Sequence, residues 1–202
     1  MTSSSARWLV LAIAFGFCVV AAGIAIRNVE RPRALASDAH FAGTPIVPPK
    51  PVEDFVLTDA TGRANHLLEH ASIQFLFFGY THCPDECPLA MGSLAHAYRS
   101  LAPDARAKMR VVFVTVDPKR DSPALLRRYL TGFDPSFVGL TGSLKQLQRV
   151  WKSYGVQVDE ATKEIGHGDA IYAIDANRRA ILIYTPDVSA TDLASDAAKL
   201  AI

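Results

Sequence analysis

Two cysteines follow closely on a buried-strand pattern, and each of them precedes a proline. The run from Ile73 to Phe78 is apolar throughout and of strand length, which predicts a strand buried on both faces. Pro84 suits the second position of a type I turn, and Pro88 suits the first residue of a helix with Cys87 as its N-cap. We therefore expect a tight turn from a central strand into a helix, with Cys83 and Cys87 in that turn.

The spacing of these cysteines indicates chemistry rather than packing. Both sulfurs are expected at a helix N-terminus, whose positive end favours thiolates over thiols. A pair of thiolates can form a reversible disulfide or bind a soft metal ion. Inert, buried cysteines are rarely so close together and so bracketed by prolines. The third cysteine, Cys18, is interpreted as an ordinary apolar residue of a membrane segment.

The N-terminus carries a pattern of its own. The 202-residue chain has 21 Lys and Arg against 20 Asp and Glu. It therefore lacks the excess of basic residues that would indicate binding to nucleic acid. Trp8 to Ile26 holds no charge and is long enough for one membrane-spanning helix, which predicts an anchor over residues 1–26. A cleaved signal peptide is the alternative, although its apolar core is usually shorter. The arginines on both sides of this run leave its orientation open.

The rest of the chain divides into a tether and one domain. Residues 27–51 mix charges, alanines and prolines without a sustained period, which is typical of a semi-rigid tether. Residues 52–202 are numerous enough to bury a sizeable core. Strand patterns at 55–57, 73–78, 111–116, 137–140, 170–174 and 180–184 alternate with helical patterns after Pro88, Ser122 and Ser143 and from Thr191.

This order predicts an α/β domain of thioredoxin-like fold, with a parallel core, an antiparallel edge and helices on both faces. In open α/β sheets, binding and catalytic residues lie beyond the carboxyl ends of the parallel strands. Cys83 and Cys87 come after one such strand, and Asp117 ends the next. Asp117 is therefore expected to support the metal ligands or to face a partner, whereas Asp121 is assigned to turn chemistry before a helix.

A copper ion held by two thiolates commonly recruits an imidazole as a third donor. His167, between two glycines and just before the strand at 170–174, is the favoured candidate because that loop faces the cysteine turn in a thioredoxin-like topology. His82 adjoins Cys83, but neighbours in an extended segment point to opposite sides. The remaining candidates are expected to lie in the tether or at the surface: His40, His66, His70 and His96.

Several motifs resemble the Sco/SenC family of copper chaperones. They are Gly79–Pro88 (GYTHCPDECP), Val116–Ser122 (VDPKRDS), Val138–Gly142 (VGLTG) and a histidine before a late strand. The resemblance runs from about Asp54 to the C-terminus, and the first two motifs are specific. It departs at one point, because the family's usual Asp-His pair is Gly166-His167 here, without the carboxylate that would orient the histidine.

The resemblance implies a thioredoxin-like domain carried by a single-pass anchor in the cytoplasmic (inner) membrane and facing the periplasm. It implies one copper ion, Cu(I) or Cu(II), held by Cys83, Cys87 and His167. The implied role is delivery of copper to, or reduction of the cysteines in, the dinuclear copper site of cytochrome c oxidase. The copper-site subunit would then be the partner, with other copper carriers or thiol reductases as further contacts.

Two classes of function remain open at this point. The first is a metallochaperone, which binds its cargo without catalytic turnover. The second is an enzyme, a thiol–disulfide oxidoreductase in which Cys83 and Cys87 form the redox disulfide, although reductases of this fold place two residues between their cysteines and here there are three. A zinc site with an open fourth position is a chemical alternative. A peroxidase is disfavoured because its adjacent threonine and arginine are not found.

Overall fold

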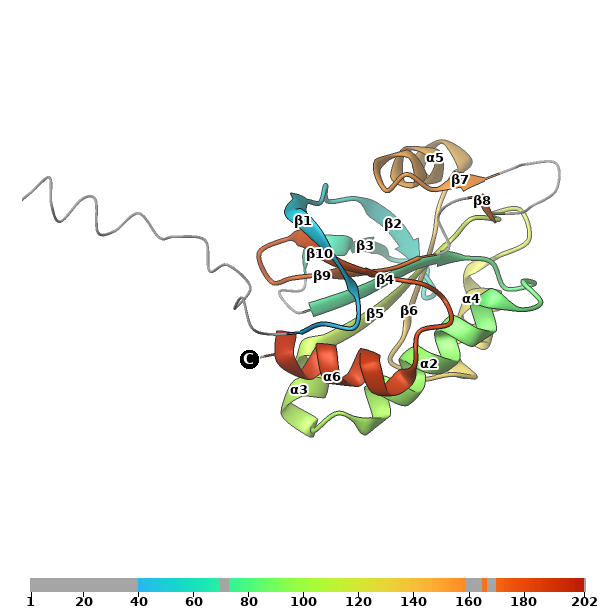
Figure 1. Ribbon diagram of the computed structural model, residues 1–202. Helices are drawn as coiled ribbons and strands as arrows, with labels where there is room; N and C mark the ends of the chain where they lie inside the picture. Colours follow the sequence, from blue (N-terminus) through green and yellow to red (C-terminus); the bar gives the residue numbers. More distant parts are fainter. Residues whose placement is uncertain (1–39, 70–72, 159–164, 167–169, 202) are drawn as a thin grey trace, which may run out of the picture. The chain divides into compact units, whose positions relative to one another are not determined.

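A computed structural model describes residues 40–69, 73–158, 165–166 and 170–201 (Figure 1). The predicted anchor over residues 1–26, the tether as far as residue 39, and His167 lie outside the described residues. Within these described ranges, no helix is both long enough and apolar enough to cross a membrane.

Two strands that are buried almost throughout form the centre of the domain, as their apolar sequences predict. β4 (Ile73–Gly79) and β5 (Met109–Thr115) run parallel, in a register that ends with Gly79 opposite Thr115. β6 (Val138–Thr141) continues the parallel set beside β5. The backbone N–H of Val116 donates to the carbonyl of Gly79 across 2.8 Å, so the carboxyl ends of β4 and β5 are fixed together.

Antiparallel strands extend this core on both sides. The sheet has eight strands in the order β1-β10-β9-β4-β5-β6-β2-β3, and β9 joins β4 antiparallel with Ile171 opposite Phe77. The outer strands are β1 (Thr44–Pro51), β2 (Val56–Asp59), β3 (Ala64–His66), β9 (Ile171–Ile174) and β10 (Arg179–Tyr184). A separate pair is formed by β7 (Gln157–Val158) and β8 (Ile165–Gly166).

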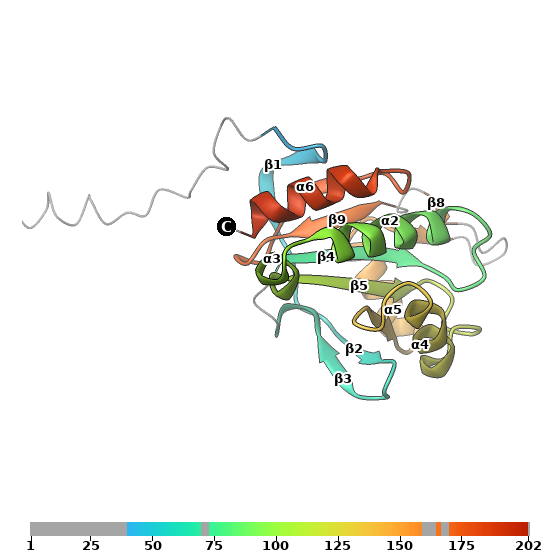
Figure 2. The same ribbon diagram turned by 90° about the horizontal axis from the view of Figure 1, so that it is seen from below.

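Helices cover both faces of the sheet (Figures 1 and 2). Because side chains alternate along a strand, Phe75 and Phe77 pack under α2 and α6 on one face, while Leu76 and Phe78 pack against α5 on the other. The helices are α2 (Glu86–Ser100), α3 (Pro103–Lys108), α4 (Pro123–Thr131), α5 (Leu144–Ser153), α6 (Ala190–Leu200) and a short 3₁₀ turn, η1 (Leu67–Glu69). This arrangement agrees with the predicted thioredoxin-like order.

The end of the predicted tether differs from the expectation. Residues 44–51 form β1 and pair with β10, although four of these eight residues are prolines. Proline has no N–H to donate and is therefore confined to sheet edges. β1 is the edge strand next to β10, and its register shifts between Pro45 and Lys50. The prolines that suggested a tether thus mark an edge strand.

The start of the helix after the cysteine turn also differs by two residues. α2 begins at Glu86 with Asp85 as its N-cap, so Cys87 lies within the first turn and is not the cap itself. Pro88 is tolerated there because the first four N–H groups of a helix have no intrahelical partner. The helix predicted after Ser143 is α5, and it begins with a capping box in which Ser143 and Gln146 are bonded to each other.

Candidate functional site: a cysteine turn at the end of the central strands

The segment between β4 and α2 is a turn that is closed by its own backbone. The N–H of Cys83 donates to the carbonyl of Tyr80 across 3.2 Å, and the N–H of Leu89 donates to the carbonyl of Asp85 across 3.2 Å. Cys83 therefore ends the turn, and Cys87 lies one helical turn later in α2. The structure thus brings the two predicted cysteines together at the carboxyl end of β4.

The two sulfurs differ in exposure. Both cysteines are reduced; Cys83 is half-buried, whereas Cys87 is 1% exposed. The backbone N–H of Cys87 donates to the sulfur of Cys83 across 3.4 Å. Gly79 makes room for the inner sulfur, since a Cβ at this position would lie 2.8 Å from the Cys87 Sγ. The pair therefore has one accessible sulfur and one that is enclosed by the core.

Burial opposes the thiolate that was expected at Cys87. It raises the pKa of the Cys87 thiol well above its ordinary value, and the neighbouring Cys83 acts in the same direction. At Cys87, burial and the helix N-terminus therefore act on the thiol in opposite directions. Burial also raises the pKa of Tyr80, and the charges of Cys83 and Cys87 add to this effect. A metal ion would have to displace the Cys87 proton.

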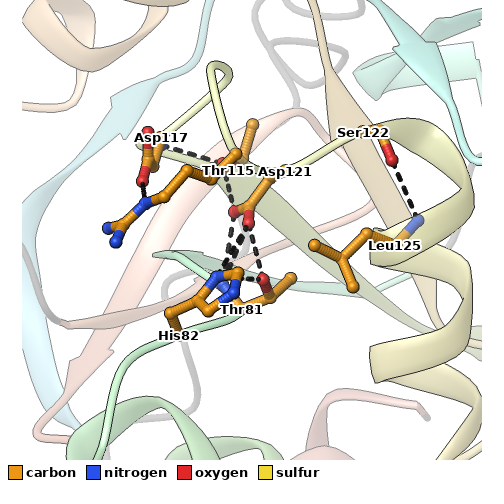
Figure 3. A network of polar contacts seen from close by, with 8 residues as sticks. Thr81, His82, Thr115, Asp117, Asp121, Ser122 and Leu125 are labelled. Carbon is orange, nitrogen blue, oxygen red and sulfur yellow. Dashed lines mark hydrogen bonds and ion pairs between the residues drawn. The ribbon is translucent and has the colours of Figure 1, made fainter.

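A buried carboxylate ties the cysteine turn to the strand beside it (Figure 3). Asp121 is 1% exposed, and both of its oxygens accept from the backbone N–H of Thr81, at 3.2 and 3.3 Å. The hydroxyls of Thr81 and Thr115 donate to the two oxygens, each across 2.6 Å. Nδ1 of His82 lies 4.0 Å from Oδ1. Asp121 thus fixes the residue two positions before Cys83.

Sequence reasoning missed this role of Asp121. The motif that contains it was recognised, but the residue was assigned to turn chemistry. Its side-chain partner Thr81 lies 40 residues away in the chain, so no local pattern connects them. The available signal was the parallel pairing itself, which places the segment after β5 beside the segment after β4.

Asp117 lies where it was predicted, directly beyond β5. It is 2% exposed, and its backbone N–H donates to the Thr115 hydroxyl across 2.9 Å. Its carboxylate pairs with Arg120, whose guanidinium stands 5.9 Å from the ring centre of Tyr80. Asp117 therefore holds a cation over the aromatic residue that begins the cysteine turn.

The histidines fall into three groups. His66 is exposed and contacts Asp54 through Nδ1 at 3.2 Å, and His40 and His96 are also exposed, as expected. His82 belongs to the cysteine turn, while His70 and His167 lie outside the described residues. Among the residues that the structure describes, no three side chains of the His, Cys, Asp and Glu types gather to hold a metal ion. The two neighbouring sulfurs suit a soft ion or a disulfide.

The chain is similar to known proteins of one family. A family model described as SCO1/SenC matches residues 44–201. The mitochondrial SCO2 homologue of Bos taurus is 37% identical over 146 residues, which cover 71% of this chain and 53% of that protein. A second similar protein, a putative copper-binding protein of Stutzerimonas stutzeri, is 40% identical over 91 residues and is covered to 45%. The chain thus spans about half the length of these relatives.

Two solved structures are similar over most of their length. The solution structures of apo Sco1 from Thermus thermophilus share 34% identity at a TM-score of 0.68, over 81% of this chain and 96% of that one. The structure of Bradyrhizobium japonicum ScoI with copper bound shares 30% identity at a TM-score of 0.66, over 73% of this chain and 98% of that one. They confirm the thioredoxin-like α/β fold, and with the family match they show that the chain belongs to the SCO1/SenC family.

Proposed function

We propose that this protein carries one copper ion on Cys83 and Cys87 and delivers it for the assembly of cytochrome c oxidase. The observation that carries this proposal is the reduced cysteine pair, joined by the N–H to sulfur contact of 3.4 Å at the end of the central strands. Thiolates are the ligands that select Cu(I). A similar protein was solved with copper bound, which supports the same cargo here.

His167 is the third donor in this proposal. It lies four residues before Ile171, the first residue of β9, and Ile171 pairs with Phe77, two residues before the end of β4. β9 therefore begins, at Ile171, near the edge of the sheet where β4 ends and the cysteine turn begins, which supports His167 as the donor. An imidazole and two thiolates together suit both Cu(I) and Cu(II).

The location of the protein is part of the proposal. The uncharged run from Trp8 to Ile26 would anchor the chain in the inner membrane, with the domain in the periplasm. The proposed partner is the copper-site subunit of the oxidase, which would receive copper or have its cysteines reduced.

A thiol–disulfide oxidoreductase is the second candidate, and the two neighbouring reduced cysteines favour it. The two functions use the same sulfurs but differ in whether a metal is held. A reductase needs no third donor, because exchange proceeds through attack of a thiolate on a disulfide sulfur.

The test is a copper titration of the reduced full-length protein, followed by absorption and paramagnetic resonance. We expect one copper ion for each chain and a thiolate-to-copper charge-transfer band after Cu(II) loading. Cys83→Ala combined with Cys87→Ala should lose both. Cys18→Ala is the matched control, because it removes the third cysteine and should bind as the wild type does. Stoichiometric binding by the double variant would refute the proposed site.

A further inference from the structure

The Asp121 carboxylate determines where the hydroxyl proton of Thr81 points. A carboxylate only accepts hydrogen bonds, and a threonine hydroxyl has one proton to donate. Oδ1 of Asp121 lies 2.6 Å from Thr81 Oγ1, which is the distance of a strong, charge-assisted bond. Oδ2 is occupied in the same way by the hydroxyl of Thr115, also at 2.6 Å. The Thr81 hydroxyl therefore donates its one proton to Asp121.

This hydrogen bond from Thr81 to Asp121 fixes the tautomer of His82. Thr81 Oγ1 lies 3.0 Å from His82 Nδ1 (Figure 3). Since the Thr81 hydroxyl has no second proton, it can only accept from the imidazole, and Nδ1 must carry the hydrogen. In the neutral ring the lone pair is then on Nε2. Histidines that bind metals are held in this manner, with the other ring nitrogen donating to an oxygen.

The side chain of His82 is open to solvent. The His82 side chain is 52% exposed. Its neighbour Cys83 carries the accessible sulfur of the pair, whereas Cys87 is 1% exposed. The sequence argument against His82 assumed an extended chain, but the hydrogen bond from Cys83 to Tyr80 makes this segment a turn. The expectation that His82 and Cys83 must point to opposite sides therefore does not hold.

We propose that His82 is an entry ligand, which receives copper through Nε2 before the ion reaches both cysteines. The inference rests on the proposed copper function and adds a step to it. Cu(I) leaves the ligands of its donor and binds His82 and Cys83, whose thiol proton passes to water. It then binds Cys87, which releases its own proton, and His82 is free again. Copper keeps its oxidation state throughout.

The tautomer can be tested without copper. In the full-length protein with ¹⁵N-labelled histidine, long-range ¹⁵N–¹H correlations distinguish a protonated Nδ1 from a protonated Nε2. We expect neutral His82 to carry its proton on Nδ1. Thr81→Val, which removes the accepting hydroxyl, should abolish this preference, and Thr81→Ser should keep it. A proton on Nε2 of wild-type His82 would overturn the arrangement.

The entry step is tested by the rate of copper uptake. Reduced full-length protein is mixed with the coloured Cu(I)–bicinchoninate complex, and loss of its colour is followed by stopped flow. We expect His82→Gln to slow uptake about tenfold. This is the lower end of the loss, about 10–100-fold, that usually follows mutation of the residues around metal ligands. The final copper loading should be unchanged. His96→Gln is the matched control, because His96 is exposed on α2 outside the turn. It should load at the wild-type rate.

Failure of each proposal gives a different result. Wild-type protein that takes no copper from the complex would refute the copper function itself. Normal loading of the wild type, together with an equal rate for His82→Gln, would refute only the entry role. Final loading lost in His82→Gln as fully as in Cys83→Ala would make His82 a permanent ligand, which also contradicts the entry role. Thr81→Val is the second variant, for the case that His82→Gln disturbs folding. It keeps the His82 side chain but removes the hydroxyl that fixes its tautomer, so it should also slow uptake.

Discussion

The backbone N–H of Cys87 donates to the sulfur of Cys83 across 3.4 Å, so the first turn of α2 contacts the more exposed of the two cysteines. The contact requires that Cys83 lie over the start of the helix, which the turn from Tyr80 to Cys83 provides. The two sulfurs therefore share one small region in which a metal ion and a disulfide exclude each other.

Oxidising this pair should abolish copper uptake, because cysteines bind copper as thiolates and a disulfide offers none. The measurement is copper stoichiometry before and after treatment with a mild oxidant, with loss of two thiols followed by a thiol reagent. Reduction should restore binding. Equal uptake by the oxidised form would show that copper binds elsewhere.

Gly79→Ala should disturb the site from inside the core. The new Cβ would lie 2.8 Å from Cys87 Sγ and 2.9 Å from atoms of Phe77 and Phe113. Overpacking of this kind typically costs about 1–3 kcal/mol of the free energy of unfolding, and we also expect a shifted Cu(II) absorption band. Both are measured on one sample, by chemical denaturation and by spectroscopy.

Gly92→Ala is the matched control for this change. Gly92 lies inside α2, and a Cβ there would meet no atom within 4 Å. Replacing a helical glycine by alanine should stabilise the protein by about 1 kcal/mol. Equal stability of the two variants would contradict the close packing of Gly79 against Cys87.

Features that depend on neighbouring residues could be predicted from the sequence, whereas features that depend on distant residues could not. The strands β4 and β5 and the helix α5 after Ser143 were predictable because each pattern depends on neighbouring residues. β1 was missed because its prolines are equally typical of a tether, and only the pairing with β10 reveals the strand. Asp121 was misassigned because its role depends on Thr81, which becomes its neighbour only after the sheet forms.

Asp196 should hold the segment before β1 in place. It is fully buried and accepts from the backbone N–H groups of Ala42 and Gly43, at 2.9 and 3.0 Å, and from the Tyr184 hydroxyl at 3.2 Å. Asp196→Ala leaves these donors without their acceptor, at a cost of about 1–3 kcal/mol for a buried group. The measurement is chemical denaturation, accompanied by chymotrypsin cleavage at Phe41, which should become faster.

Asp187→Ala provides the comparison, because Asp187 is exposed in the loop before α6. Surface substitutions of this kind usually change stability by less than about 0.5 kcal/mol. If Asp196→Ala were as stable and as resistant to cleavage as Asp187→Ala, the attachment of this segment would contribute nothing.

The proposed anchor predicts how the full-length protein fractionates. It should remain with membranes after high-salt and alkaline washing, since the run from Trp8 to Ile26 has no charge to oppose insertion. Deleting residues 8–26 should release the protein into the soluble fraction with unchanged copper binding. Recovery of the full-length protein in the wash would contradict the anchor, and an N-terminus mapped after residue 20 would indicate cleavage instead.

His167→Ala distinguishes a copper chaperone from a dithiol reductase. In the copper function it removes one of three donors, and the two thiolates that remain can still hold Cu(I), so Cu(I) binding should weaken only in part. Cu(II) prefers more donors in a tetragonal array, and its spectrum should be lost or altered. The reduction potential of the Cys83 and Cys87 pair should move little, because disulfide exchange needs no imidazole.

The measurements are Cu(I) competition, Cu(II) paramagnetic resonance and equilibration of the dithiol with a redox buffer. His66→Ala is the matched control, since His66 is an exposed histidine on β3 that contacts Asp54. A chaperone should lose oxidase assembly with His167→Ala, whereas a reductase should keep it. An unchanged Cu(II) spectrum in His167→Ala would assign the third donor to another side chain, and His82, with its lone pair directed by Asp121 and Thr81, would be the first to test.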